Sequence, residues 1–192
     1  MTPAIDPGRR RPHLVVAVAV CVVLLLVGAL GVRHLVVRPF TVPSASMQPA
    51  LQVGDVILAD RSTRGTAQPG QIVVFDGSGY FAPGDEDGDR FWVKRVIAVG
   101  GQRVSCCGRD GTIEVDGVAL EEPYLVPGTA PSEIEFDLLV PEGRMFVLGD
   151  NRADSTDSRH LLGAPGGGMI PVDRVIGSVH EVVWPLSRRG SL

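Results

Sequence analysis

The feature that most limits how this chain can fold is an uninterrupted apolar run near its N-terminus. From Leu14 to Val32 the sequence carries no charged residue and is almost entirely aliphatic. At a rise of about 1.5 Å per residue, a helix over this run is roughly long enough to cross a hydrocarbon core of ~30 Å. A cleaved secretory leader is the alternative, but its apolar core is normally only ~7–15 residues long. We therefore expect residues 14–32 to form a retained transmembrane anchor.

This anchor divides the 192 residues into a basic N-terminus at 1–13, the span at 14–32 and one domain at 33–192. Basic residues flank the span on both sides, at positions 9–11 before it and at Arg33, His34 and Arg38 after it. The positive-inside bias toward a cytoplasmic N-terminus is therefore slight. The formal net charge of -4 provides no basic surface, so we expect no nucleic acid partner.

Beyond the anchor, short apolar runs alternate with Gly, Pro and Asp, which is typical of a mostly β domain. Asp116-Gly117, between Val115 and Val118, strongly indicates a two-residue hairpin turn. With no long amphipathic helix outside the anchor, the predicted fold is a single transmembrane helix followed by an all-β or mostly β domain. The expected strands are Asp55 to Ala59, Gln71 to Phe75, Phe91 to Val99, Arg103 to Cys106, Thr112 to Val115, Ile134 to Val140, Met145 to Leu148 and Val175 to Val183.

One serine and one lysine in this domain suggest nucleophilic chemistry. A serine hydroxyl is a poor nucleophile until a base removes its proton, and a neutral lysine amine can be that base. Lys94 lies in an apolar run, where an extended chain places it on one face with Trp92, Val96 and Ala98. Burial on such a face can lower a lysine pKa by roughly 3–5 units from ~10.4. Ser46 and Lys94 are therefore the candidate nucleophile and general base.

Each of these pieces also has a more ordinary interpretation. Two prolines around Ser44 and Ser46 make a good turn, and a lysine in an apolar strand is often an edge-strand charge or a snorkelling side chain. A third segment favours the catalytic interpretation of Ser46 and Lys94 over these ordinary ones. Residues 149–159 read Gly-Asp-Asn-Arg-Ala-Asp-Ser-Thr-Asp-Ser-Arg and directly follow the apolar run 145–148.

With these three segments in this order, the chain resembles bacterial type I signal peptidases, the membrane-bound serine proteases that remove signal peptides from exported proteins. The resemblance extends from the apolar run to about Trp184. One departure is visible, since Ala45 stands where the family usually has glycine, and an alanine there argues against a positive φ. The matching boxes are Ser44 to Pro49, Gly54-Asp55, Lys94 to Gly101, and Gly149 to Arg159.

The resemblance implies a role for each site residue. Ser46 would be the nucleophile and Lys94 the base, while the Ser46 backbone N–H and the Ser44 hydroxyl would form the oxyanion hole. Ser155 would hydrogen-bond and orient the lysine amine. Asp157 and Arg159 would form a supporting ion pair.

The resemblance also implies partners and a location. The substrates would be secreted preproteins with small residues at the first and third positions before the cut. The enzyme would be a single-pass protein of the plasma membrane, in contact with the lipid bilayer, with its catalytic domain on the extracytoplasmic face. The mechanism needs no cofactor and no metal ion.

Several observations leave alternatives open at this stage. His160 and Asp157 permit a Ser-His-Asp triad, which ranks below the lysine dyad. Cys106 and Cys107 are adjacent and form either a disulfide or two thiols. The acidic loop 77–90 lacks the full spacing of a calcium-binding EF-hand and is expected to be solvated. A self-cleaving Ser-Lys repressor and a non-catalytic, membrane-anchored β module are the competing classes of function.

Overall fold

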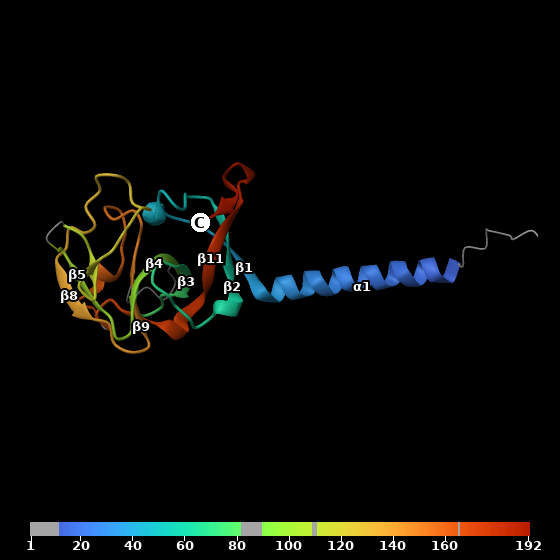
Figure 1. Cartoon of the computed structure of the whole chain (residues 1–192), viewed down its shortest axis with the longest axis horizontal. Coiled ribbons are helices and arrows are strands. Elements are labelled where there is room, and N and C mark those ends of the chain that lie inside the picture. The colour runs from blue at the N-terminus through green and yellow to red at the C-terminus, as the bar shows by residue number, and fades with distance from the viewer. Residues whose placement is uncertain (1–11, 82–89, 109–110, 165) are drawn as a thin grey trace, which may run out of the picture. The chain divides into compact units, whose positions relative to one another are not determined.

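The computed structural model describes residues 12–81, 90–108, 111–164 and 166–192. These residues fall into two compact units, one ending at Val36 and the other running from Val37 to Leu192 (Figure 1). The acidic residues 85–87 and 89, considered above for calcium, lie outside the described ranges.

The first unit consists of one continuous helix, α1 (Pro12–Val36), drawn blue in Figure 1. A run of aliphatic residues without proline or charge between residues 14 and 32 supports a helix of this length. The helix predicted over 14–32 is therefore present, with additional residues at both ends. Across the ranges that the structure describes, no helix meets the combined length and hydropathy of a membrane span.

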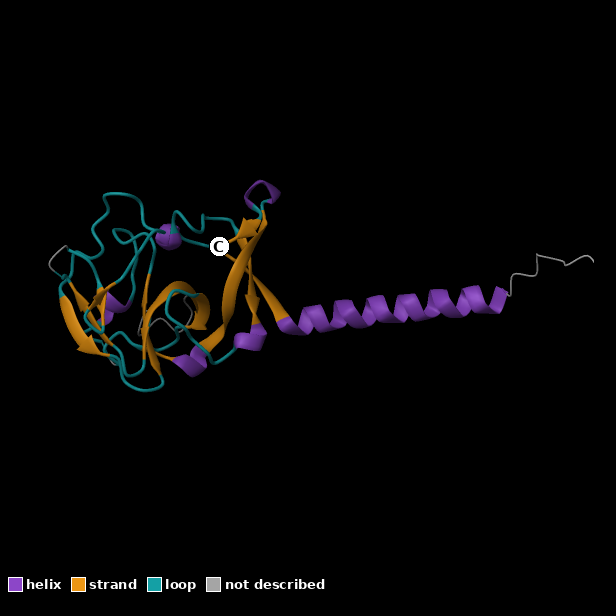
Figure 2. Ribbon diagram, in the orientation of Figure 1, coloured by secondary structure: helices purple, strands orange, loops and turns teal. Residues whose placement is uncertain are grey.

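The regular elements of the second unit are strands and five short 3-10 helices, joined by long loops (Figure 2), and every strand pair among the described residues is antiparallel. The larger, 8-stranded sheet has the order β1-β2-β11-β3-β4-β9-β10, with β12 also paired to β11. Its strands are β1 (Val37–Thr41), β2 (Val56–Asp60), β3 (Ile72–Asp76), β4 (Phe91–Val99), β9 (Arg144–Leu148), β10 (Ile170–Pro171), β11 (Val175–Trp184) and β12 (Gly190–Ser191). The smaller, 4-stranded sheet has the order β7-β6-β5-β8, with β5 (Arg103–Cys106), β6 (Glu114–Val115), β7 (Val118–Ala119) and β8 (Phe136–Leu139).

The larger sheet curls so that its first strand approaches β4. Three strands separate β1 from β4 in the sheet order, yet the rings of Phe40 and Phe91 lie 5.4 Å apart, edge to face. Strand β3 lies in the sheet between β11 and β4, and all five of its residues are buried. Burial on both faces explains its unbroken apolar run Ile72 to Phe75. The curl brings the start of β4 near the chain that leaves β1.

The mostly β prediction is confirmed for this unit. Strands β4 and β5 have the predicted bounds, and the other predicted strands are present with ends shifted by a few residues. Asp116 and Gly117 both have positive φ, as a type I′ hairpin between β6 and β7 requires. The expected strands omitted β1, β7, β10 and β12, although the predicted hairpin turn implied a strand at β7. Strand β1 carries no alternating pattern, and the other three have two residues each. Cys106 and Cys107 form a disulfide, one of the two states left open above.

Candidate active site

Ser46 lies in a single 3-10 turn, η1 (Ala45–Met47), just after β1. Ser44 is extended and precedes this turn, and its hydroxyl donates to Ser46 Oγ over 3.3 Å. Two contacts from Asn151 hold the turn in place, because its backbone N–H donates to Ser46 O at 3.0 Å and its side-chain amide donates to Ala45 O at 3.2 Å. The nucleophile candidate is therefore fixed by the loop that follows β9.

Lys94 lies in the middle of β4, opposite Val73 of β3, and only 2% of it is exposed. Its Nζ donates to Ser46 Oγ at 2.7 Å. Burial lowers the pKa of Lys94 to about 8, although the negative charges of Asp157 and Asp150 partly oppose this effect. A substantial fraction of this amine is therefore neutral near pH 8 and can accept a proton.

Arg95 points away from Lys94, as the alternation of a strand requires. Its guanidinium donates to both carboxylate oxygens of Asp150, at 2.8 and 2.6 Å, and stacks on the ring of Tyr124 at 3.9 Å. Asp150 is fully buried, and burial raises its pKa while the charge of Arg95 acts against that increase. This pair ties the strand that carries Lys94 to the loop at 149–159.

Asp157 and Arg159 form the buried ion pair that was predicted, with Arg159 Nη2 2.8 Å from Asp157 Oδ2. Asp157 also accepts from the backbone N–H groups of Arg159 and Gly149. Although burial acts in the opposite direction, these hydrogen bonds and the charge of Arg159 hold the pKa of Asp157 below its ordinary value. The loop thus keeps one charged carboxylate near the lysine.

Ser155 is buried beside this loop but does not make the expected hydrogen bond to Lys94. Its Oγ makes no well-aligned hydrogen bond within the described residues, but the hydroxyl is close enough to Asp157 to help lower the pKa of that carboxylate. Gly149 separates it from the nucleophile turn, because a Cβ added to Gly149 would collide with both Ser155 Oγ and Ser46 O. A glycine is therefore required here by space and not by φ.

His160 does not join the candidate site. Its Nδ1 lies 3.6 Å from Asp157 Oδ1, and 44% of its side chain is exposed. The one side-chain base that hydrogen-bonds Ser46 Oγ among the residues the structure describes is Lys94. The geometry therefore gives the Ser-His-Asp alternative no support.

A cavity of about 380 Å³ opens in front of Ser46 and Lys94. It is bounded on one side by the chain from the end of β1 through the nucleophile turn, and on the other by the first half of β4. Its walls are mainly apolar and include the two serines and the lysine. The lining residues are Phe40, Thr41, Val42, Pro43, Ser44, Ser46, Met47, Arg90, Phe91, Trp92, Val93 and Lys94.

Two supporting contacts were not anticipated from the sequence. Asp55, in the second box, is paired with Arg188 at 3.0 Å and accepts from the backbone N–H of Gln52. Asn151 lies in the fourth box, Gly149 to Arg159, but the sequence interpretation gave it no role. The place of Asn151 in that box could have marked it as a site residue. Arg188 lies outside the boxes, so no pattern in the sequence pointed to it.

Comparison with known proteins identifies relatives of this chain. The family model described as signal peptidase, peptidase S26, matches residues 14–184. A probable signal peptidase I of Mycobacterium leprae is 35% identical, covering 88% of this chain and 77% of that protein. Signal peptidase I T of Bacillus subtilis is 31% identical, covering 86% and 83% respectively.

A crystal structure of a signal peptidase I from Enterococcus faecalis, 28% identical, covers 59% of this chain and 96% of that one with a TM-score of 0.43. The match to the family model spans most of the chain and includes Ser46, Lys94 and the loop at 149–159. This chain belongs to the signal peptidase family, peptidase S26.

Proposed function

We propose that this enzyme removes N-terminal signal peptides from exported preproteins, with Ser46 as the nucleophile and Lys94 as the general base. The observation that carries the proposal is the 2.7 Å separation between Lys94 Nζ and Ser46 Oγ, both of which line an open cavity. A lysine held there with a pKa of about 8 can act as a base in neutral or mildly alkaline solution.

In the acylation step, neutral Lys94 accepts the proton of Ser46 as its oxygen attacks the scissile carbonyl. The resulting ammonium then gives the proton to the nitrogen of the departing chain, and an ester between Ser46 and the signal peptide remains. In the second step Lys94 takes a proton from a water molecule whose oxygen attacks the ester carbonyl, and the ammonium then gives that proton to Ser46 Oγ as the signal peptide leaves. The lysine therefore alternates between its two protonation states without any cofactor.

The negative charge that develops on the carbonyl oxygen must be stabilised by hydrogen-bond donors. We assign these to the backbone N–H of Ser46 and to the hydroxyl of Ser44, which lies 3.3 Å from the nucleophilic oxygen. Loss of one such donor typically reduces turnover by an amount equivalent to about 2.7–4 kcal/mol. The substitution Ser44→Ala should therefore lower kcat more than it changes KM.

Three further residues would support the dyad. Ser155 is assigned to orient the amine of Lys94 during the reaction, when the lysine no longer donates to Ser46. The Asp157–Arg159 pair would hold the loop at 149–159 and supply the negative charge that stabilises the lysine ammonium.

The cavity walls suggest how a preprotein would bind. An extended peptide laid between the chain at 41–44 and the start of β4 could form backbone hydrogen bonds with either side. The small apolar space near Ser46 would then accept short side chains, in agreement with substrates that carry alanine before the cut. Which preproteins are cleaved is a matter for direct assay.

We further propose that residues 14–32 anchor the enzyme in the plasma membrane, with 1–13 in the cytoplasm and the domain at 33–192 on the extracytoplasmic face. The support is the uncharged run itself and the tethered nature of the substrates. External protease added to intact cells should digest the domain. A protected domain, or a mature N-terminus after Val32, would refute this topology.

The main test is a preprotein cleavage assay with the full chain in detergent, comparing wild type with Ser46→Ala. We expect the wild type to release the signal peptide, the variant to be inactive, and chelators to have no effect. Wild-type activity in the Ser46→Ala enzyme would contradict the proposal, and an inactive wild type would favour a non-catalytic module.

A further inference from the structure

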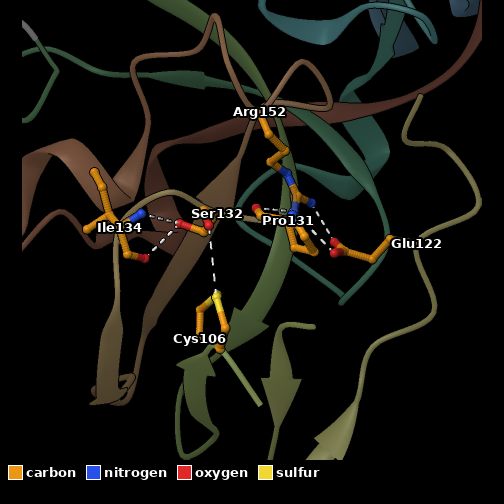
Figure 3. The surroundings of a disulfide bond; sticks show 7 residues. Cys106, Glu122, Pro131, Ser132, Ile134 and Arg152 are labelled. Atoms are coloured by element: carbon orange, nitrogen blue, oxygen red, sulfur yellow. Dashed lines mark hydrogen bonds and ion pairs between the residues drawn. A yellow bond between two sulfur atoms is a disulfide. The ribbon is translucent and has the colours of Figure 1, made fainter. Parts of the chain in front are cut away.

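A loop outside the family boxes is hydrogen-bonded to the loop at 149–159, which carries Ser155, Asp157 and Arg159. Between β7 and β8 the chain passes through residues 120–132, here named the clamp segment. Both ends of this segment contact the guanidinium of Arg152, since Nη1 donates to Glu122 Oε2 at 3.1 Å and to Pro131 O at 2.8 Å (Figure 3). Arg152 Nη2 donates to the other oxygen of Glu122.

This contact is almost completely removed from water. The side chain of Arg152 is 1% exposed and that of Glu122 is 6% exposed. A buried arginine that loses its only carboxylate partner is left with an uncompensated charge, which strongly disfavours its position. Loss of the Glu122 carboxylate would leave the guanidinium with its bonds to Pro131 O and Gly149 O but without a charge partner among the described residues.

Tyr124, also in the clamp segment, supports the contact between Glu122 and Arg152. Its hydroxyl donates to Glu122 Oε1 at 2.8 Å, and its ring lies under the guanidinium of Arg95. Burial and the nearby carboxylate of Glu122 raise the pKa of Tyr124, so the phenol keeps the proton that it donates. At the other end of the segment, Cys107 Sγ lies 3.9 Å from the carbonyl oxygen of Ser132.

Arg152 is also hydrogen-bonded to other residues of its own loop at 149–159. Its Nε donates to Gly149 O at 3.0 Å, and its own carbonyl accepts from Arg159 Nη2 at 3.0 Å. Gly149 is packed directly between Ser155 and the carbonyl of Ser46. A shift of Arg152 is therefore transmitted to the backbone that spaces the nucleophile turn from Ser155.

We propose that Glu122 is a positioning residue for the peptidase reaction, acting through Arg152 to fix the position of Gly149. Gly149 in turn sets the distance between Ser155 and the turn that carries Ser46. This inference rests on the proposed function. None of the residues that line the cavity belongs to the clamp segment. Glu122 should therefore affect turnover and leave substrate binding unchanged.

The test compares Glu122→Gln with Glu121→Gln in the full chain, using a preprotein in the cleavage assay. Glu121 is adjacent and exposed, so its substitution removes the same charge without touching Arg152. We expect Glu122→Gln to lower kcat by about 10- to 100-fold with KM within twofold of wild type, because small misplacements of reacting groups have effects of this size. Glu121→Gln should match wild type, and Glu122→Asp should recover part of kcat.

A folded Glu122→Gln enzyme with normal kcat, or one with raised KM and normal kcat, would overturn the inference. If Glu122→Gln fails to fold, Tyr124→Phe replaces it, because it removes only the hydroxyl that donates to Glu122. That variant should then show reduced kcat at unchanged KM, and a normal kcat would overturn the inference. Ser46→Ala, assayed alongside, separates the two ideas, since an active Ser46→Ala refutes the proposed function whatever Glu122 does.

Discussion

Lys94 Nζ and Ser46 Oγ are 2.7 Å apart, although 48 positions separate the two residues in the chain. The contact forms because β4 carries the lysine in the interior of the sheet while the chain leaving β1 returns past the same strand. Trp92, two residues before Lys94 on β4, has its ring centroid 5.5 Å from Nζ. The lysine is thus surrounded by protein on the side away from the serine, and this burial is what lowers its pKa.

The first prediction concerns the pH dependence of cleavage. Only the neutral form of Lys94 can accept the serine proton, so kcat/KM should rise with pH and level off above an apparent pKa of about 8. The measurement is a pH–rate profile with a preprotein at low substrate concentration. An activity that is constant from pH 6 to pH 10 would contradict a lysine base.

Lys94→Arg provides a second prediction. Arginine keeps the positive charge but cannot give up its proton inside a protein, so the variant should fold and yet be inactive. Circular dichroism establishes folding, and the cleavage assay measures turnover. Near-normal turnover in a folded Lys94→Arg enzyme would show that Lys94 is only a structural cation.

Lys94→Met should be inactive and more stable than wild type at neutral pH. The folded-state pKa of about 8 lies below the ordinary value of 10.5, so the unfolded chain binds the proton more tightly. The cost of burying the ammonium is fully present below pH 8 and disappears as the pH rises to 10.5. The gap between the two pKa values corresponds to about 3 kcal/mol of unfolding free energy. Denaturant unfolding at pH 7 and above pH 10 should show this gain at the lower pH only.

Ser155→Ala should separate stability from turnover. The buried hydroxyl makes no well-aligned hydrogen bond in the part of the chain that is described and only helps to lower the pKa of Asp157, so its removal should change the free energy of unfolding little. If Ser155 orients Lys94 during the reaction, kcat should fall while KM stays the same. Unchanged kcat would exclude the proposed contact.

Gly149→Ala should damage the site by steric collision. The added methyl group would meet Ser155 Oγ and the carbonyl of Ser46, and one of these groups must move. We expect a large loss of kcat, measured in the same cleavage assay. Gly163→Ala is the matched control, because a Cβ there has nothing within 4 Å. Equal activity of the two variants would show that the tight packing at Gly149 is unimportant for catalysis.

The sequence by itself determined the local elements. Apolar runs of the right length located most strands of the domain, and two positions suited to positive φ located the β6–β7 hairpin. An aliphatic run predicted the helix, while the order of the segments around Ser46, Lys94 and residues 149–159 identified the candidate nucleophile and base. These patterns are readable because burial on one face of a strand, or around a helix, constrains residues that are neighbours in the chain.

Only the tertiary structure decided which distant groups meet. The curl that brings Phe40 to Phe91, the bonds from Asn151 to the nucleophile turn and the burial of Arg152 against Glu122 join segments far apart in the chain. Strand β1 carries Pro39 and pairs only with β2, so it forms by long-range pairing and not by its own pattern. Contacts of this kind depend on how the sheet closes, a property of the whole domain that no local window of sequence contains.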